Sequence, residues 1–436
     1  MLLLVSSAEV RPQWSADPRE NNPICTEPQD QIAPQLSPDG TGGSIYVWLD
    51  RRNSNLYQIY AQRFDSLGHA VWTSQGIPVC QRDGTQRQVE VISDGSGGAI
   101  VTWQSFRDGI YAQRITAEGV ALWETDGTLI SPTLAQNPFP KAVPDGQGGA
   151  IITWADNRSG NYRIYAQRID ADGDLLWNVS GLPNGELVSV SATDGCQYPR
   201  IVANEKGGAV IVWTTENDNE IYAQTIDSTG QIRWFPPGVK VFDGAGDLST
   251  SSLPMVLPDG ESGIYVAWSD YRNNDYDVYA QRIRHDGIDM WTDNGVAVCN
   301  EPGIQRDVDV TSDSAGGAIV VWHDLRINAR GVYARRVNKF GLFAWNTIPV
   351  CTLPASNAHS PSIASDMEGG AIIAWVDSRN PATQEDIYAQ RLHKTDGHTV
   401  WQSGGVIISS ADRKQSVPKL TSNGRGGAII VWEDNR

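Results

Sequence analysis

Short apolar runs alternate with glycine-rich polar turns along the whole chain, and the same run occurs eight times. The run GGAIIVW and its variants are β-branched and apolar up to a tryptophan, as is typical of a strand buried on both faces. Each run is followed by a segment such as Ile-Tyr-Ala-Gln-Arg-Ile, whose alternating character predicts a half-buried strand. The tryptophans that end the eight runs are Trp48, Trp103, Trp154, Trp213, Trp268, Trp322, Trp375 and Trp432.

The repeat period, near 55 residues, covers the full length of 436 residues. A second tryptophan belongs to each unit, so that the two sets of eight account for all 16 tryptophans. Each unit reads as four strands: A (such as Pro199 to Ala203), the apolar run B, the Tyr-Ala-Gln-Arg strand C, and D (such as Gly76 to Cys80). Four antiparallel strands per unit predict an all-β, eight-bladed β-propeller that forms a single domain over residues 1–436. A β-solenoid is the alternative, although its coils are usually shorter.

The two ends of the chain each carry half of a unit. The C-terminal end supplies strands A and B (Lys419 to Trp432), and aligning Trp14 with Trp177 places strand C at Leu2 to Val5 and strand D around Pro23 to Cys25. We therefore expect a clasp of two strands plus two strands, in which residues 419–436 and 1–30 complete blade eight and remove exposed edges.

Three alternatives to an intramolecular clasp stay open. Residues Met1 to Ala8 can be read as the remnant of a secretion signal, although they lack a basic start. Closure between molecules would instead give head-to-tail chains. The stop at Arg436 also leaves the reading of the chain as a fragment of something longer.

Composition excludes several function classes. The formal net charge is −17 and the pI is near 4.7, so like charge disfavours nucleic acid and anionic membrane surfaces as partners. No apolar run approaches the roughly 18 residues that a membrane span needs. The five cysteines are an odd number, and we expect them to be unpaired small apolar residues, mostly at the same point of different repeats. They are Cys25, Cys80, Cys196, Cys299 and Cys351.

Segment lengths indicate which face of the disc is variable. The span from the strand-B tryptophan to the strand-C tyrosine runs from 8 to 13 residues, whereas the A–B and C–D turns are nearly constant in length. In an antiparallel blade the B–C and D–A connections emerge on one face. Because loops carry function more readily than scaffolds, we expect a protein or glycan partner on this B–C/D–A face.

Strand B ends in a recurring Asp-x-Arg motif. A functional interpretation makes it a ring that binds sugars or cations, and a structural one makes each Asp cap its loop while each Arg ties blades together. Repetition favours structure, because catalytic sites are asymmetric. The motif occurs at Asp50/Arg52, Asp156/Arg158, Asp270/Arg272, Asp324/Arg326, Asp377/Arg379 and Asp434/Arg436; unit two has Ser105 and Arg107, and unit four has Thr215 and Asn217.

Other chemistry-bearing residues do not form a recognisable motif. The channel-facing position of strand A is mixed in charge and predicts a wet channel of partly paired side chains; it is occupied by Gln35, Glu90, Lys141, Arg200, Met255, Asp309, Ser362 and Lys419. Asp170-Ala-Asp172-Gly173-Asp174 resembles a calcium loop but reads better as a turn. Asn178-Val-Ser180 is a single glycosylation sequon. The six histidines (His69, His285, His323, His359, His393 and His398) show no catalytic spacing, and there is no zinc motif. We therefore assign no catalytic, cofactor-binding or metal-binding residue.

The repeat GGAIIxWxDxR…DIYAQRxDxxG…LW resembles one found in many secreted or surface bacterial proteins, mostly uncharacterised and propeller-like. The resemblance implies an extracellular or cell-surface location and transfers no catalytic residue. The expected function is a non-catalytic scaffold, binding or adhesion protein that can self-assemble, for example into a filament, and the chain is predicted not to be an enzyme.

The alternative is a propeller-based glycan hydrolase or lyase. It would need a carboxylate pair or a histidine cluster at unmatched loop positions. Glu216, Asp218 and Glu220 in unit four are the candidates.

Overall fold

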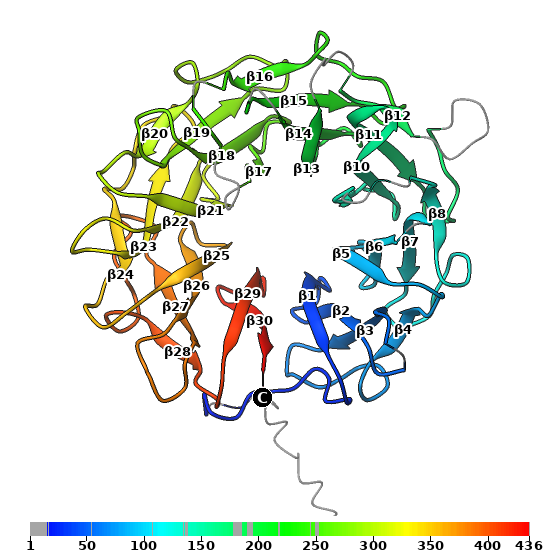
Figure 1. Cartoon of the computed structure of the whole chain (residues 1–436), viewed down its shortest axis with the longest axis horizontal. Coiled ribbons are helices and arrows are strands. Elements are labelled where there is room, and N and C mark those ends of the chain that lie inside the picture. Colours follow the sequence, from blue (N-terminus) through cyan, green and yellow to red (C-terminus); the bar gives the residue numbers. More distant parts are fainter. Residues whose placement is uncertain are drawn as a thin grey trace, which may run out of the picture.

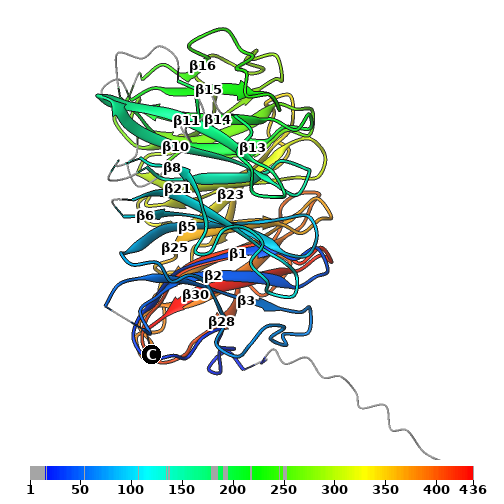
Figure 2. The same cartoon turned by 90° about the vertical axis from the view of Figure 1, so that its right-hand side faces the viewer.

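Small antiparallel sheets are arranged as blades around a central opening in the computed structural model (Figure 1). The structure describes residues 15, 17–53, 55–106, 108–133, 135, 138–177, 185–189, 195–216, 219–244, 246–248 and 253–435. Within these ranges every strand pair is antiparallel and no helix occurs, so none could cross a membrane. The view at right angles shows the blades stacked around the ring (Figure 2).

Seven blades have four strands in the order A, B, C, D from the axis outward, and an eighth has two. Blades 1 and 2 are β1 (Gln31–Pro38), β2 (Ser44–Asp50), β3 (Gln58–Phe64), β4 (Ile77–Cys80), and β5 (Gln86–Ser93), β6 (Ala99–Ser105), β7 (Gly109–Ile115), β8 (Thr128–Ser131). Blades 3 and 4 are β9 (Lys141–Pro144), β10 (Ala150–Ser159), β11 (Asn161–Ile169), β12 (Glu186–Leu187), and β13 (Cys196–Ala203), β14 (Ala209–Thr215), β15 (Ile221–Ile226), β16 (Val239–Phe242). Blades 5 and 6 are β17 (Met255–Pro258), β18 (Ile264–Asp270), β19 (Asp277–Ile283), β20 (Val296–Cys299), and β21 (Gln305–Ser312), β22 (Ala318–Asp324), β23 (Gly331–Val337), β24 (Ile348–Cys351). Blade 7 is β25 (His359–Ser365), β26 (Ala371–Asp377), β27 (Asp386–Leu392), β28 (Val406–Ser409), and the two-stranded blade 8 is β29 (Gln415–Ser422) and β30 (Ala428–Asp434).

The core of each complete blade is its strand B, whose first seven residues are all buried, as its β-branched sequence predicts. In blade 5 the strand-B tryptophan Trp268 stacks on the strand-C tyrosine Tyr279, with ring centroids 6.2 Å apart. Its indole N–H donates to Asp270 Oδ2 at 2.7 Å, two residues further along the same strand. The buried ring thus satisfies its one polar atom within its own blade.

The second tryptophan set joins neighbouring blades at the A–B and C–D turns. In blade 2, Trp123 donates from Nε1 to the Ala171 carbonyl in the C–D turn of blade 3, at 3.1 Å. Arg114 of the Tyr-Ala-Gln-Arg strand donates to the same carbonyl at 3.1 Å and to Asp94 of its own A–B turn. Gly173 has a φ of +94°, and a Cβ there would lie 2.8 Å from the Trp123 ring, which explains the fixed glycine in this turn.

The prediction of four-stranded antiparallel propeller blades is confirmed, but the prediction of eight complete blades with a two-plus-two clasp is wrong. Blade 8 contains only β29 and β30 among the described residues. The proposed strand C at Leu2 to Val5, together with Trp14 and the Met1 to Ala8 signal remnant, lies outside the described residues. With no described strand to bridge them, Pro23 to Cys25 and β30 form no ladder.

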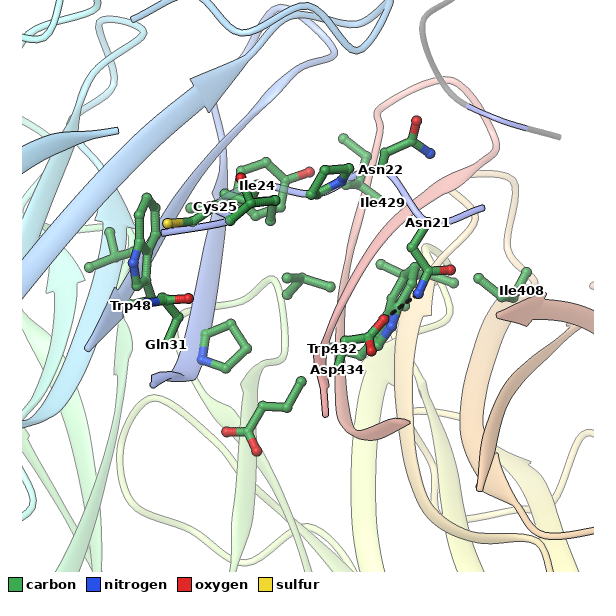
Figure 3. Close-up of a pocket in the computed structure, with 18 of the residues that line it drawn as sticks. Asn21, Asn22, Ile24, Cys25, Gln31, Trp48, Ile408, Ile429, Trp432 and Asp434 are labelled. Atoms are coloured by element: carbon green, nitrogen blue, oxygen red, sulfur yellow. Dashed lines mark hydrogen bonds between the residues drawn. The ribbon is translucent and has the colours of Figure 1, made fainter. Parts of the chain in front are cut away.

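The N-terminal segment nevertheless reaches the place that a strand D of blade 8 would occupy (Figure 3). Cys25 accepts a hydrogen bond from Arg52 of blade 1 at 3.0 Å, just as the strand-D residue Cys351 accepts one from Arg379 at 3.0 Å. Asn21 donates to Asp434 and accepts from Ser409, which ties the segment to blades 8 and 7. The ring is therefore closed by side-chain contacts at this seam.

The five cysteines form no disulfide in the structure, as the sequence predicts, and all but Cys25 are buried.

Candidate functional site

The repeated Asp-x-Arg motif builds the scaffold. In blade 7, Asp377 accepts hydrogen bonds from Arg379 Nε at 2.9 Å, from Trp375 Nε1 at 3.2 Å and from the Ser356 hydroxyl at 2.6 Å. Burial opposes ionisation of Asp377, but the bonds from Arg379 and Ser356 outweigh it and keep the pKa of this carboxyl below its usual range. The Arg379 guanidinium lies 3.9 Å from the centroid of Tyr388. Asp377 and Arg379 are therefore engaged by contacts within the protein, as a structural role requires.

Blades that lack the motif fill the same role from elsewhere. In blade 2 the guanidinium of Arg82 lies over Tyr111 at 4.4 Å, and in blade 4 the ammonium of Lys240 lies 5.5 Å from Tyr222. A cation therefore covers the strand-C tyrosine in each of the seven complete blades. Such compensation is the mark of a packing requirement. Arg107, Asn217 and Arg436 lie outside the described residues.

The channel-lining ring of strand A contains paired groups, as predicted. Lys141 forms an ion pair with Glu90 of the preceding blade. Asp309 accepts hydrogen bonds from the Ser362 hydroxyl at 3.2 Å and from the Ile363 backbone at 3.1 Å. Burial raises the pKa of Asp309. These contacts join neighbouring blades across the channel wall.

The remaining sequence candidates do not come together as a site. Asp170 accepts backbone hydrogen bonds from Asp172 at 3.0 Å and Asp174 at 2.9 Å, which is the turn role. Glu216 accepts from Gln197, and Glu220 pairs with Lys240, so the two glutamates have separate partners. Asp218 and the sequon Asn178-Val-Ser180 lie outside the described residues.

Six A strands carry a one-residue β-bulge close to the B–C/D–A face. The bulged residues are not glycine yet have positive φ: Ala33, Gln88, Tyr198, Asp307, Ser360 and Val417, at 50° to 54°. A bulge bends the strand and changes the direction of a side chain, and residues with such strained dihedrals are often found at functional sites. The mouth of the axial channel is therefore ringed by side chains that the bulges orient.

Two histidines from neighbouring blades meet at this mouth, each beside a carboxylate. His323 precedes the last residue of β22, and His359 begins β25, with ring centroids 6.1 Å apart. His323 Nδ1 lies 3.4 Å from Asp307 on the bulge of β21. His359 Nε2 lies 3.8 Å from Glu385, in the loop just before β27. We call these four residues the histidine cluster.

The environment of His359 favours its neutral form. Burial, assisted by the neighbouring His323 and Lys414, lowers the pKa of His359 against the opposing fields of Glu385 and Asp307. His323 is buried, whereas about a quarter of the His359 side chain is exposed. A neutral imidazole open to solvent and held beside a carboxylate can accept a proton, which is the requirement for a general base.

Aromatic and cationic side chains occupy other parts of the same mouth. Phe139 and Tyr198 contact each other with ring centroids 4.8 Å apart, and both rings are half-buried. Arg87 lies over Phe106 at 4.1 Å. A mouth with aromatic surfaces and a few fixed polar groups has the composition of a ligand site.

A cavity at the seam has a different character. It measures about 1230 Å³ and lies beside β30 at the seam, between blade 8 and the N-terminal segment, with Ile24, Trp48, Ile429 and Trp432 among its lining residues (Figure 3). The other B strands are wholly buried over their first seven residues, whereas only Val431 of β30 is buried. This cavity is where a complete blade would hold its strand C, between β30 and the segment that contains Cys25. It lacks the paired acid–base groups of the histidine cluster.

Spacing could not reveal the histidine cluster, because its members are far apart in sequence and on different blades. A usable signal exists in the repeat register. The position after the strand-B tryptophan holds His323 in unit six, but Leu49, Gln104 or Val376 in other units. The sequence shows no catalytic spacing among the histidines, and only the fold brings His323 and His359 together.

The comparisons with known proteins give no family. No family model matches the chain, and no curated protein does. Among solved structures, the polysaccharide lyase Uly1 is 8% identical with a TM-score of 0.48, covering 90% of this chain and 96% of that one. A eukaryotic initiation factor is 10% identical with a TM-score of 0.43, covering 90% and 94%. An α-L-arabinofuranosidase from Fusarium graminearum is 11% identical with a TM-score of 0.37, covering 69% and 90%.

These matches correct the prediction that the chain is not an enzyme. That prediction rested on the lack of a catalytic motif and on a resemblance that transfers no catalytic residue, whereas solved structures that match this chain include a polysaccharide lyase and an arabinofuranosidase. The similarity is too low to transfer an activity or a residue. The case for catalysis has to come from the side chains of this chain.

Proposed function

We propose that the protein cleaves a glycan at the axial mouth on the B–C/D–A face, with His359 as its acid–base residue. The observation that carries this proposal is the histidine cluster, two imidazoles from neighbouring blades that each face a carboxylate. The cluster occupies unmatched positions of the repeat. A catalytic group needs such positions, because one reaction centre cannot be repeated around a ring.

His359 would act as the group that touches the substrate. Its neutral imidazole accepts a proton, either from a water that attacks the glycosidic carbon or from a sugar carbon next to a carboxylate. The bond to the glycosidic oxygen breaks, and this oxygen leaves as a hydroxyl group with a proton from the imidazolium or from solvent. Glu385 stabilises the imidazolium that results, and Lys414 in turn pairs with Glu385 at 2.9 Å. His323, fixed by Asp307, is a positioning residue behind His359. The half-buried Phe139 and Tyr198 supply apolar surface for the faces of sugar rings.

A glycan polymer as substrate agrees with an extracellular location, which we include in the proposal. The resemblance of the repeat to those of secreted bacterial proteins is its support.

The test is incubation of the purified chain with neutral and uronate-containing polysaccharides. Hydrolysis releases reducing ends alone, whereas elimination also creates a carbon–carbon double bond that absorbs in the ultraviolet. We expect His359→Ala to lower kcat by about 10²- to 10⁴-fold, the usual contribution of a general acid or base. His285→Ala, in the exposed C–D turn of blade 5, is the matched control and should keep full activity.

Two results would contradict the proposal. The first is that no polysaccharide of either class is cleaved by the wild-type chain. The second is cleavage that His359→Ala leaves unchanged.

A second candidate function is assembly by strand addition at β30. The supporting observation is that no described strand pairs with the outer edge of β30, while the B strand of every complete blade is flanked by a strand C. The groove fits a strand of the Tyr-Ala-Gln-Arg type, and a second copy of this chain is the occupant that we propose. Light scattering as a function of protein concentration tests this second function. Assembly is ruled out if the measured mass stays that of one chain at all concentrations and an added peptide spanning Asp386 to Leu392 has no effect.

A further inference from the structure

The C–D turn of blade 7 differs from the other C–D turns in length and in chemistry. It joins Leu392 to its bridge partner Thr399 over seven positions, whereas Val337 and Phe343 in blade 6 are six apart. The longer turn carries two histidines and an aspartate, His393, Asp396 and His398. No other C–D turn of the chain carries two histidines.

The three side chains converge on one point. One ligand atom from each of His393, Asp396 and His398 lies within 4.8 Å of the others. His398 Nδ1 is 2.6 Å from Asp396 Oδ1, and His393 Nδ1 is 3.8 Å from the same oxygen. The two imidazoles stack with centroids 4.7 Å apart, and all three side chains are exposed by 44% or more. A metal ion from solvent can therefore reach them.

The backbone of the turn is held in place by the preceding blade. The Lys394 carbonyl accepts hydrogen bonds from Trp345 Nε1 at 3.2 Å and from Arg336 Nη1 at 2.6 Å. Gly397 lies against the Trp345 ring, at 2.8 Å from an added Cβ. Within the turn, the His393 N–H donates to the His398 carbonyl at 3.0 Å. The ligands thus project from a fixed loop, which lowers the entropic cost of gathering them around an ion.

We propose that His393, Asp396 and His398 bind a divalent transition-metal ion of the Zn²⁺ type. Two imidazole nitrogens and one carboxylate oxygen are ligands that Zn²⁺ binds at about 2.0–2.2 Å. Side-chain rotations that move these ligand atoms by about 1 Å would bring them to such distances from one ion. The nitrogen ligands disfavour Ca²⁺ and Mg²⁺, which prefer oxygen. Three protein ligands leave further coordination positions facing solvent. The site lies in a C–D turn and is separate from the histidine cluster.

Calorimetric titration of the full chain with ZnCl₂ tests this proposal. Loss of a residue that only supports a metal ligand weakens metal binding by roughly 10- to 100-fold. We expect His398→Ala and His393→Ala, which each remove a ligand itself, to weaken Zn²⁺ binding by more than this. His69→Ala is the matched control, because His69 lies beside Asp65 at 3.1 Å in the C–D turn of blade 1 without a second imidazole. Its affinity for Zn²⁺ should equal that of the wild type.

Co²⁺ absorption spectra identify the ligands independently. We expect bands of a nitrogen and oxygen site that vanish in His398→Ala. The proposal is overturned if the wild type binds no Zn²⁺, if His398→Ala binds it as tightly as the wild type, or if a thiolate band shows that a cysteine is the ligand. It is also overturned if His359→Ala, and not His398→Ala, removes the binding.

Discussion

Arg168 and Asp145 form a buried ion pair that blade 4 replaces with neutral residues, and this natural replacement allows a sharp test. Asp145 Oδ2 accepts from Arg168 Nε at 3.0 Å and from Nη2 at 2.9 Å, and 7% of Arg168 and 3% of Asp145 is exposed. Blade 4 has Asn204 and Thr225 at the equivalent positions. Asn204 still accepts the two turn N–H groups at 2.9–3.0 Å. We therefore compare Asp145→Asn, Arg168→Thr and the double variant.

The expected magnitudes follow from which groups remain buried. Each single change leaves one charge without its partner, which costs about 3–5 kcal/mol for a buried pair. We place Asp145→Asn near 3 kcal/mol, because the Ser228 carbonyl and the Gln147 side chain still accept from Arg168, both at 3.1 Å. The double variant leaves no buried charge but loses the link to Ser228 in the next blade. It should cost about 3 kcal/mol, giving a coupling near 3 kcal/mol, at the upper end of measured values.

Scanning calorimetry measures the effect. An unfolding entropy of about 2.1 cal/mol/K per residue gives roughly 0.9 kcal/mol/K for this chain, so about 3 kcal/mol lowers the Tm by about 3 °C. Each of the three variants should show this shift. If the double variant falls by about 6–7 °C, the two changes are additive and the pair is not coupled. If Asp145→Asn shifts the Tm by less than about 1 °C, the reasoning about buried charge is refuted.

Three further predictions concern other parts of the ring. Gly127→Ala should destabilise the protein by about 2–3 kcal/mol in thermal unfolding, because Gly127 has a φ of +95° and an added Cβ would clash with Trp103. Gly95→Ala should cost only about 1 kcal/mol, because Gly95 has a φ of +76° but open space around an added Cβ. Equal costs for the two variants would contradict this prediction. Burial lowers the pKa of His359, so below about pH 6.5 the folded state binds fewer protons than the unfolded state, and the free energy of unfolding falls with the pH. His359→Gln should flatten this part of the profile of stability against pH. An unchanged profile would contradict the prediction. Burial raises the pKa of Asp289 to about 6, so its ionisation lowers the stability of the folded state as the pH rises from about 4 to 6. Asp289→Asn should therefore stabilise the protein at pH 7 by about 1 kcal/mol after allowance for solvent screening, as measured by urea titration. A loss of stability in this variant would show that the folded state needs the carboxylate.

The blades could be predicted because each depends on contacts within one unit. Strand B is apolar and rich in β-branched residues up to its tryptophan, so its burial on both faces follows from local sequence. The interval between tryptophans and the fixed turn glycine then predict the propeller. The structural role of Asp377 and Arg379 followed from repetition alone. Local pattern and tertiary structure agree in these elements, as they should in a sequence with few competing folds.

Blade 8 and the bulged A strands were beyond this reasoning. The clasp was inferred by aligning Trp14 with Trp177, but pairing with β30 needs a strand C between β30 and the segment that contains Cys25, and no described residue provides one. The bulge residues Asp307 and Ser360 have positive φ although neither is glycine. Because positive φ is expected of glycine, the residue types at these positions did not indicate the bulge.

The two asymmetric clusters show what repetition hides. A residue that recurs in most units, such as the motif aspartate Asp324, is held by the requirement to build every blade and so cannot distinguish one blade from another. A residue that departs from its register, such as His323 or His398, is free of that requirement, and the fold then decides whether it stands alone or meets others. His323 meets His359 because strand B of blade 6 ends beside the start of strand A of blade 7, and His398 meets His393 because one turn is longer by a residue. Chemistry on this ring is therefore expected where departures from the repeat coincide in space, and the repeated motifs should be read as its frame.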